Sequence, residues 1–432
     1  MEPTAAAGTE SVFTYGAPAL KFGVGAAEEI GYDVAQLLGE RAGARVLVVT
    51  DPGVRAAGHA DAVAERLVAA GLDATVFDGV HVEPTDRSLE EAVAFARDGG
   101  PWDAVVAVGG GSAIDTAKAV DLLTTNDGDL MDYVNAPVGR ARAPRNPLVP
   151  LVAVPTTTGT GSESTTICVL DVLDQHVKTG ISHPRLRPTM AVVDPRLTLS
   201  QPAGVTAAAG MDILCHALES YTARPFTAGA RKRPEDRVPY CGANPIADMW
   251  SERALAVLAG AFRTAVRHGD DLEAREQMAL AATFAGMGFG NAGVHIPHAN
   301  AYPIAGRVRG FHPTDYPSDE PMVPHGMAVA LTAPEAFRFT FESSPERHLH
   351  AARLLAPASA YDASPGLLPQ VLVDLMRDID LPAGLGAVGY AESDVGDLVE
   401  GTMKQQRLLA TAPREVTEDD IAGILRASME LW

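Results

Sequence analysis

Cysteine and basic residues are both scarce in this sequence. Its 432 residues include 3 cysteines, Cys168, Cys215 and Cys241, which lie far apart in the chain. An odd number of widely spaced cysteines excludes a disulfide framework and a cysteine-rich zinc module, and it favours a reducing compartment. The chain has 34 Lys and Arg against 55 Asp and Glu, which gives a net charge of −21. We expect so acidic a protein to bind neither nucleic acid nor an anionic membrane surface.

Long hydrophobic runs are also absent. No stretch approaches the roughly 18 consecutive apolar residues of a membrane-spanning helix. Apolar residues nevertheless make up 47% of the chain, which is ample for a core. The first basic residue is Lys21, so the N-terminal residues resemble neither a secretory signal nor an arginine-rich transit peptide. From these observations we expect a cytoplasmic protein.

The pattern of apolar residues predicts two domains. The first part of the chain alternates short β-branched runs with helical patterns, which is typical of a parallel α/β domain. The strand-like runs occupy residues 45–51, 74–78, 103–109, 150–155, 166–170 and 190–194. Beyond Asp194 and Pro195 the chain changes to long helical segments rich in Ala, Leu and Met. We therefore predict an α/β domain over residues 1–195 and a helical domain over residues 196–432.

A glycine run follows the strand predicted at 103–109. Gly109, Gly110, Gly111 and Ser112 stand between that strand and a helical pattern. Glycines let the backbone approach a diphosphate, and the start of the helix offers N–H groups and the positive end of a dipole. The run therefore favours a dinucleotide. A tight strand-to-helix turn without a ligand is the alternative, because the sequence matches neither G-x-G-x-x-G nor a Walker A loop.

Polar residues also follow two other predicted strands. Asp51, at the end of the strand at 45–51, can accept both hydroxyls of a ribose and would repel a 2′-phosphate, which favours NAD over NADP. Its alternative role is a helix N-cap. Hydroxyl side chains suited to a phosphate or a carboxamide crowd the turn after the strand at 150–155: Thr156, Thr157, Thr158, Thr160 and Ser162.

A carboxylate and several histidines in the second half have the spacing and surroundings of metal ligands. Asp212 and His216 are four residues apart, so on a helix both project from one face. His295, His298 and His325 lie in apolar segments that contain glycine. Three imidazoles and one carboxylate suit Zn²⁺ or Fe²⁺, and the absence of thiolates disfavours a structural zinc site. An ordinary contact on a helix surface remains the alternative for Asp212 and His216.

Taken together, these segments resemble the iron-containing (group III) alcohol dehydrogenases. The segments GGGSAIDTAK from Gly109, PTTTGTGSE from Pro155 and GMDILCHALE from Gly210 occur in that family's order, followed by the two histidine segments. Within the family, stretches such as LCHALESYT from Leu214 and PERHL from Pro345 are most similar to the hydroxyacid-oxoacid transhydrogenases. The resemblance runs through nearly the whole chain.

The resemblance implies a dehydroquinate synthase-like architecture, with a Rossmann-like NAD-binding domain followed by a helical metal-binding domain. It also implies that Fe²⁺ or Zn²⁺ is held by Asp212, His216, His298 and His325. His298 is preferred to His295 because Ala301-Tyr302-Pro303 then aligns with an Ala-His-Pro segment of the family.

The same resemblance indicates further site residues. Tyr302 stands where the family has a second histidine. The role of that histidine therefore falls to Tyr302, to a neighbour such as His295, or to no residue in this chain. Lys178 is a third catalytic candidate by its position in the family. Asp115, in the glycine-rich segment, joins the predicted cofactor residues.

The resemblance implies a reaction in which 4-hydroxybutyrate becomes succinic semialdehyde while 2-oxoglutarate becomes 2-hydroxyglutarate, through tightly held NAD. An ordinary NAD-dependent dehydrogenase and a dehydroquinate synthase-like lyase are the alternatives.

Both substrates carry a remote carboxylate, which an arginine binds well. The basic residues of two long loops are candidates, with a solvated run of charges as the alternative: Arg224, Arg231, Lys232, Arg233 and Arg237, or Arg307 and Arg309. We expect a homodimer on general grounds.

Overall fold

The computed structural model describes residues 8–175, 177–316, 321–357 and 361–432. The chain divides into two compact units by its internal contacts. One, the α/β unit, comprises residues 17–201 and 269–279. The other, the helical unit, comprises the described residues within 8–16, 202–268 and 280–432. Compared with the predicted boundary at residue 195, residues 8–16 belong with the helical unit and residues 269–279 belong with the α/β unit.

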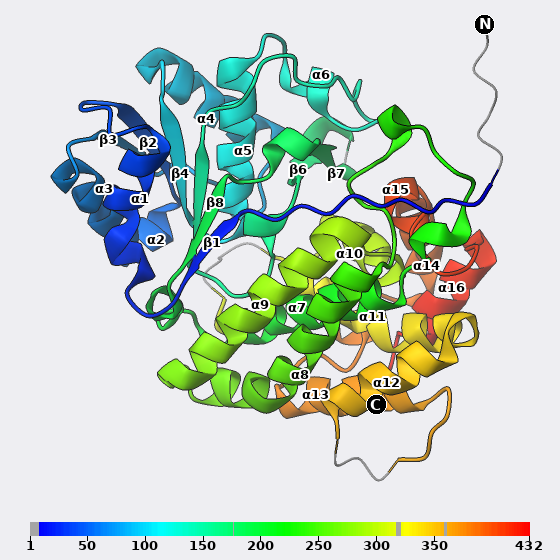
Figure 1. The fold of residues 1–432 in the computed structure, drawn as a ribbon. Coiled ribbons are helices and arrows are strands. Elements are labelled where there is room, and N and C mark those ends of the chain that lie inside the picture. Colours follow the sequence, from blue (N-terminus) through cyan, green and yellow to red (C-terminus); the bar gives the residue numbers. More distant parts are fainter. Residues whose placement is uncertain (1–7, 176, 317–320, 358–360) are drawn as a thin grey trace, which may run out of the picture. The chain divides into compact units, whose positions relative to one another are not determined.

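A six-stranded parallel sheet forms the centre of the α/β unit (Figure 1). Its strands lie in the order β1-β8-β5-β4-β2-β3, and every neighbouring pair is parallel. They are β1 (Ala19–Phe22), β2 (Arg45–Val49), β3 (Asp73–Phe77), β4 (Ala104–Gly109), β5 (Leu151–Pro155) and β8 (Met190–Val193). The predicted strand at 166–170 lies outside this sheet, because β6 (Ile167–Val172) pairs with β7 (Val177–Ser182) as an antiparallel hairpin.

Helices cover both faces of the sheet, which explains its near-continuous apolar strands. Leu47 of β2 and Val105 of β4 face one core with α4 (Asp86–Gly99) and α5 (Gly111–Thr125). Val46 and Val106, each one residue away, face the opposite core with α1 (Ile30–Leu37) and α3 (His59–Ala69). Successive side chains of a strand point to opposite faces, so each strand supplies both cores. The short helices α2 (Pro52–Ala56) and α6 (Leu130–Tyr133) complete the unit.

The helical unit is built around α7 (Ala203–Thr222), which is buried along most of its length and packs against α8 (Pro245–Arg267) and α11 (His325–Thr340). A helix that is apolar all round belongs in a core. The α10 helix (Ile296–Gly306) packs against α11 and α14 (Val395–Met403). The remaining helices are α12 (Pro345–Leu355), α13 (Leu367–Asp378), α15 (Gln406–Leu409) and α16 (Glu418–Ala427), while α9 (Leu272–Ala292) has residues in both units. Among the described residues, none of the helices has the length and apolar character needed to cross a membrane.

Candidate active site

The predicted cofactor residues meet at one edge of the parallel sheet. Strands β2, β4 and β5 are neighbours, so the residues after their carboxyl ends lie side by side. A β-carbon added at Gly110 would lie 3.0 Å from Thr157 Oγ1, and one at Gly111 would lie 2.7 Å from Thr160 Cγ2. The glycine run and the threonine turn are therefore packed directly against each other. The α5 helix begins at Gly111 without a side-chain cap.

The two carboxylate oxygens of Asp51 have different surroundings. Oδ1 accepts a hydrogen bond from the backbone N–H of Val54 at 2.9 Å, which makes Asp51 the N-cap of α2. Oδ2 faces Gly109 at the end of β4. Capping therefore occupies one oxygen, and the other is directed toward the glycine run.

A buried lysine that the sequence did not single out connects these segments. Lys118, which is fully buried, donates to Ser162 Oγ at 2.8 Å and to the backbone oxygen of Ile167 at 2.7 Å, and lies 3.3 Å from Asp115 Oδ1. Burial lowers the pKa of Lys118, against the opposing effect of Asp115. Ser162 in turn donates to Asp115. The ammonium group of Lys118 thus contacts two of the predicted cofactor residues, Asp115 and Ser162. The sequence signal for this contact was that Lys118 follows Asp115 by three residues on a predicted helix.

Lys178 lies in the β6–β7 hairpin of the α/β unit. It is buried between the carboxylates of Glu83 and Asp171, with Asp171 Oδ2 at 3.1 Å. Burial lowers its pKa, but the two carboxylates outweigh burial and raise it. The backbone N–H of Glu83 donates to Ser112 Oγ at 3.1 Å, so this ion pair adjoins the glycine run. A catalytic role for Lys178 stays a prediction.

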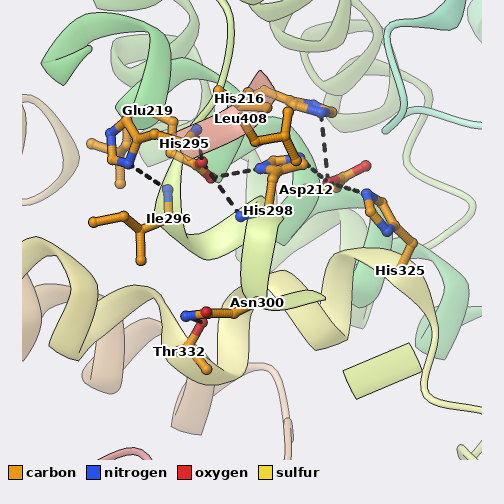
Figure 2. A network of polar contacts seen from close by, with 12 residues as sticks. Asp212, His216, Glu219, His295, Ile296, His298, Asn300, His325, Thr332 and Leu408 are labelled. Carbon is orange, nitrogen blue, oxygen red and sulfur yellow. Dashed lines mark hydrogen bonds and ion pairs between the residues drawn. The ribbon is translucent and has the colours of Figure 1, made fainter. Parts of the chain in front are cut away.

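In the helical unit, α7, α10 and α11 bring the predicted metal ligands together (Figure 2). One ligand atom each from Asp212, His298 and His325 lies within 4.8 Å of the other two. Asp212 Oδ1 is 3.4 Å from His298 Nε2, 3.8 Å from His216 Nε2 and 3.9 Å from His325 Nε2. The His216 ring stacks on Phe289, with their centroids 3.8 Å apart. Residues separated by up to 113 positions thus converge on one carboxylate oxygen.

The chemistry of this cluster fits a divalent cation. Asp212, His216 and His298 are buried, and Asp212 Oδ1 and His298 Nε2 have no hydrogen-bond partner among the described residues. Burial alone would raise the pKa of Asp212, but the surrounding imidazoles lower it. Burial lowers the pKa of His216 to about 3. A metal binds the ionised form of a carboxylate and the neutral form of an imidazole, and it would satisfy the buried ligand atoms that lack a hydrogen-bond partner among the described residues.

Glu219 is a second carboxylate that the sequence reasoning missed. Its side chain is fully buried, and its Oε1 lies 2.6 Å from Nδ1 of His298. Burial lowers the pKa of His298, but Glu219 and Asp212 outweigh burial and raise it to about 9. Glu219 follows Asp212 by seven residues and His216 by three, so the helical repeat already placed it on the same face of α7.

The catalytic candidates His295 and Tyr302 have different surroundings. His295 is fully buried at the start of α10, where its Nδ1 accepts from the backbone N–H of Ile296 at 2.8 Å and its Nε2 lies 3.1 Å from Thr222 Oγ1. Burial lowers its pKa to about 4. Tyr302 lies nearer to the cluster, with its ring centroid 6.1 Å from that of His325. The structure therefore brings Tyr302 beside a predicted ligand, whereas His295 caps a helix.

The candidate loop cations are mostly exposed or paired with carboxylates. Arg237 lies 3.1 Å from Glu10, and Arg233 lies 2.8 Å from Asp236. Further pairs are Arg307–Asp397 at 3.3 Å and Arg309–Asp394 at 2.5 Å. Arg224, Arg231 and Lys232 are exposed. Binding of a substrate carboxylate by these loops stays a prediction.

Comparison with known families agrees with this geometry. "Iron-containing alcohol dehydrogenase" matches residues 17–195, and "Fe-containing alcohol dehydrogenase family, C-terminal" matches residues 238–429. The chain belongs to the iron-containing alcohol dehydrogenase family, and it is an oxidoreductase. The family resemblance and the fold predicted from the sequence are thereby confirmed.

Individual relatives extend over nearly the whole chain. Hydroxyacid-oxoacid transhydrogenase, mitochondrial, from Bos taurus is 43% identical over 431 residues, covering 98% of this chain and 91% of the relative. The Homo sapiens protein of the same name is 43% identical over 436 residues, with the same coverage. Among solved structures, a 1,3-propanediol oxidoreductase has a TM-score of 0.83 and 33% identity, covering 97% of this chain and all of that one. Sulfoacetaldehyde reductase from Bifidobacterium kashiwanohense, solved with NAD⁺, has a TM-score of 0.78 and 26% identity, covering 97% of this chain and 99% of that one.

The expectation of a cytoplasmic protein is contradicted by the two hydroxyacid-oxoacid transhydrogenases, which are named as mitochondrial proteins. That expectation came from the composition of the N-terminal residues and from the small number of cysteines. A reducing compartment is all that the cysteine content supports, and such a compartment need not be the cytoplasm.

Proposed function

We propose that this protein is a hydroxyacid-oxoacid transhydrogenase that uses NAD and a divalent metal. The observation that carries the proposal is the convergence of Asp212, His298 and His325 in a chain that is 43% identical to such enzymes over 98% of its length. The proposed substrates are 4-hydroxybutyrate, which becomes succinic semialdehyde, and 2-oxoglutarate, which becomes 2-hydroxyglutarate.

The helical unit supplies the proposed metal ligands, which are Asp212, His216, His298 and His325. Fe²⁺ and Zn²⁺ both suit one carboxylate and three imidazoles. A cation there supplies Lewis-acid chemistry to a hydroxyl or carbonyl oxygen of the substrate. Tyr302 is buried and lies close to His325. Its proposed role is to line the metal centre on the side where the substrate binds.

The α/β unit supplies the proposed NAD site. Gly109 to Ser112 and the start of α5 suit a diphosphate, since backbone N–H groups and the helix dipole favour an anion there. Oδ2 of Asp51, which faces Gly109, suits ribose hydroxyls. Thr156, Thr157 and Thr160 offer hydroxyls on the facing turn, while Asp115 and Ser162, tied to Lys118, hold that turn in place. Bound NAD supplies the hydride carrier.

The proposed reaction balances without a net change in the cofactor. The hydroxyacid loses a hydride and a proton and leaves as the aldehyde or oxoacid. The 2-oxoacid then gains a hydride and a proton and leaves as a hydroxyacid. Because the same cofactor serves both halves, the enzyme needs no free NAD in solution.

The deciding experiment incubates purified protein with 4-hydroxybutyrate and 2-oxoglutarate without added NAD, and measures 2-hydroxyglutarate. Formation of 2-hydroxyglutarate supports the transhydrogenase. If the product requires added NAD⁺, and NADH accumulates when 2-oxoglutarate is left out, the protein is an ordinary dehydrogenase instead. The Asp212→Ala variant should lose both bound metal and turnover, and it serves as the control for background chemistry.

A further inference from the structure

Glu219 makes contacts to both the side chain and the backbone of α10. Its carboxylate is fully buried in the helical unit, on the same face of α7 as Asp212 (Figure 2). Oε1 lies 2.6 Å from His298 Nδ1, while Oε2 accepts from the backbone N–H of His295 at 2.6 Å and lies 3.4 Å from that of His298. All of these neighbours can donate a hydrogen bond to it, so the carboxylate acts as an acceptor only.

We propose that Glu219 is a positioning residue that fixes the tautomer and the ring orientation of His298, so that His298 Nε2 is presented to the metal. A neutral imidazole carries one N–H and one nitrogen lone pair. Because Nδ1 donates to Glu219, the neutral form of His298 that binds a metal has its lone pair on Nε2, the nitrogen that is 3.4 Å from Asp212 Oδ1. This inference rests on the proposed metal centre.

The second oxygen gives Glu219 a further effect on the same ligand. Through Oε2 it binds backbone N–H groups at the start of α10, where a carboxylate also interacts favourably with the helix dipole. One carboxylate therefore sets both where α10 begins and which nitrogen of His298 faces the cluster. Outer partners of this kind orient metal ligands and increase their affinity for the metal.

A purely structural role is the competing explanation, and the variant Glu219→Gln separates the two. Glutamine has nearly the same shape, and its amide oxygen can still accept from the backbone N–H of His295. Its NH₂ group then faces His298 Nδ1 and favours the opposite tautomer, which puts a proton on Nε2. A structural role predicts lower stability with unchanged metal affinity; a positioning role predicts weaker metal binding in a folded protein.

The experiment removes metal from the full chain with a chelator and then titrates Co²⁺ into the native protein and Glu219→Gln, following the visible absorption of Co²⁺. We expect Glu219→Gln to bind Co²⁺ about 10–100-fold more weakly, with an altered spectrum. The matched control is Thr332→Val. This variant removes the hydroxyl that accepts a hydrogen bond at 3.2 Å from Nδ2 of Asn300, another residue of α10, and it leaves Glu219 and His298 unchanged. This control should bind Co²⁺ like the native protein, and thermal unfolding checks that both variants fold.

Equal Co²⁺ affinity and an unchanged spectrum in a folded Glu219→Gln variant would overturn the role of Glu219 and leave the metal centre intact. Failure of the native protein to bind Co²⁺ would overturn both. If Glu219→Gln does not fold, NMR of the native protein with ¹⁵N-labelled histidine and bound Zn²⁺ decides the matter. We expect a proton on Nδ1 of His298, and a proton on Nε2 instead would refute the proposal.

Discussion

Oδ2 of Asp51 lies 3.5 Å from the position that a β-carbon would occupy at Gly109, the last residue of β4. The same aspartate caps α2 through Oδ1. The carboxylate thus lies beside the ends of the neighbouring strands β2 and β4, and its second oxygen is directed to the place where the proposed dinucleotide would lie. The capping role and the binding role can be separated by mutation.

The variant Asp51→Ser should lose NAD affinity without losing stability. Serine is as good an N-cap as aspartate, but it has no carboxylate for the ribose and no charge to repel a 2′-phosphate. We expect NAD⁺ to bind roughly tenfold more weakly, equivalent to about 1.4 kcal/mol, and the preference over NADP⁺ to shrink. Fluorescence titration of cofactor-free protein measures both affinities. The control variant Asp51→Ala should in addition destabilise the fold by about 1 kcal/mol, because it also removes the N-cap. If Asp51→Ser bound NAD⁺ as tightly as the native protein does, the ribose-binding role of Asp51 would be contradicted.

The variant Lys118→Met should strongly destabilise the α/β unit. Removing the buried ammonium leaves Asp115 without its cation, and breaking one side of a buried ion pair costs roughly 3–5 kcal/mol. Adding Asp115→Asn should restore part of that loss, because the uncompensated charge is then gone. Urea unfolding of the native protein, both single variants and the double variant gives the coupling free energy. Strictly additive losses would show that the two side chains do not interact.

Asp121 should make the protein less stable as the pH rises from about 4 to 7. Burial raises its pKa to about 7, against a hydrogen bond from the backbone N–H of Val149 at 3.0 Å. Below the ordinary aspartate pKa of about 3.9, both the folded and unfolded states are protonated, and no stability is lost. Above it the unfolded chain releases a proton that the folded state retains, so the free energy of unfolding falls until about pH 7.

The test is Asp121→Asn, which can keep the bond from Val149 and cannot ionise. Its stability should match that of the native protein near pH 4 and exceed it by an amount on the order of a few kcal/mol at pH 8. Urea unfolding at the two pH values measures the difference. Parallel pH profiles for the two proteins would rule out Asp121 as the source.

The variant Gly326→Ala should separate two of the proposed metal ligands. A β-carbon at Gly326, beside His325 on α11, would lie 2.1 Å from the backbone oxygen of Ala208 and 2.8 Å from Asp212 Cβ on α7. The helices would have to move apart, at a cost on the order of 1–3 kcal/mol. We expect lower stability and weaker Co²⁺ binding, measured by urea unfolding and by titration.

Gly260→Ala is the matched control for this substitution. Gly260 lies within α8, and a β-carbon there would have no described atom from outside its own stretch of helix within 4 Å. Alanine should stabilise that helix by up to about 1 kcal/mol and leave Co²⁺ binding unchanged. Equal behaviour of the two variants would mean that close packing at Gly326 does not hold the ligands together.

The α/β half of the fold could be predicted because its strands are buried on both faces and read as continuous apolar runs. Polar residues directly after those runs, such as Asp51 and Thr156, had to share one edge once the strands were parallel. The run at 166–170 was ambiguous, because β-branched residues suit an antiparallel hairpin as well as a central strand. The membership of residues 8–16 and 269–279 could not be read from local composition, because contacts between distant segments place the first in the helical unit and the second in the α/β unit.

Residue type and spacing along the chain were sufficient to indicate the family, the sheet edge with its glycine run, and the set of metal-ligand candidates. They could not distinguish the surroundings of His295 from those of His298, which lie three residues apart on the same short segment. Both histidines are buried, so the distinction depends on their partners from α7: Thr222 lies against His295, whereas Glu219 and Asp212 lie on either side of His298. Local sequence carries propensity and periodicity, but hydrogen-bond partners and desolvation arise only when distant segments pack together.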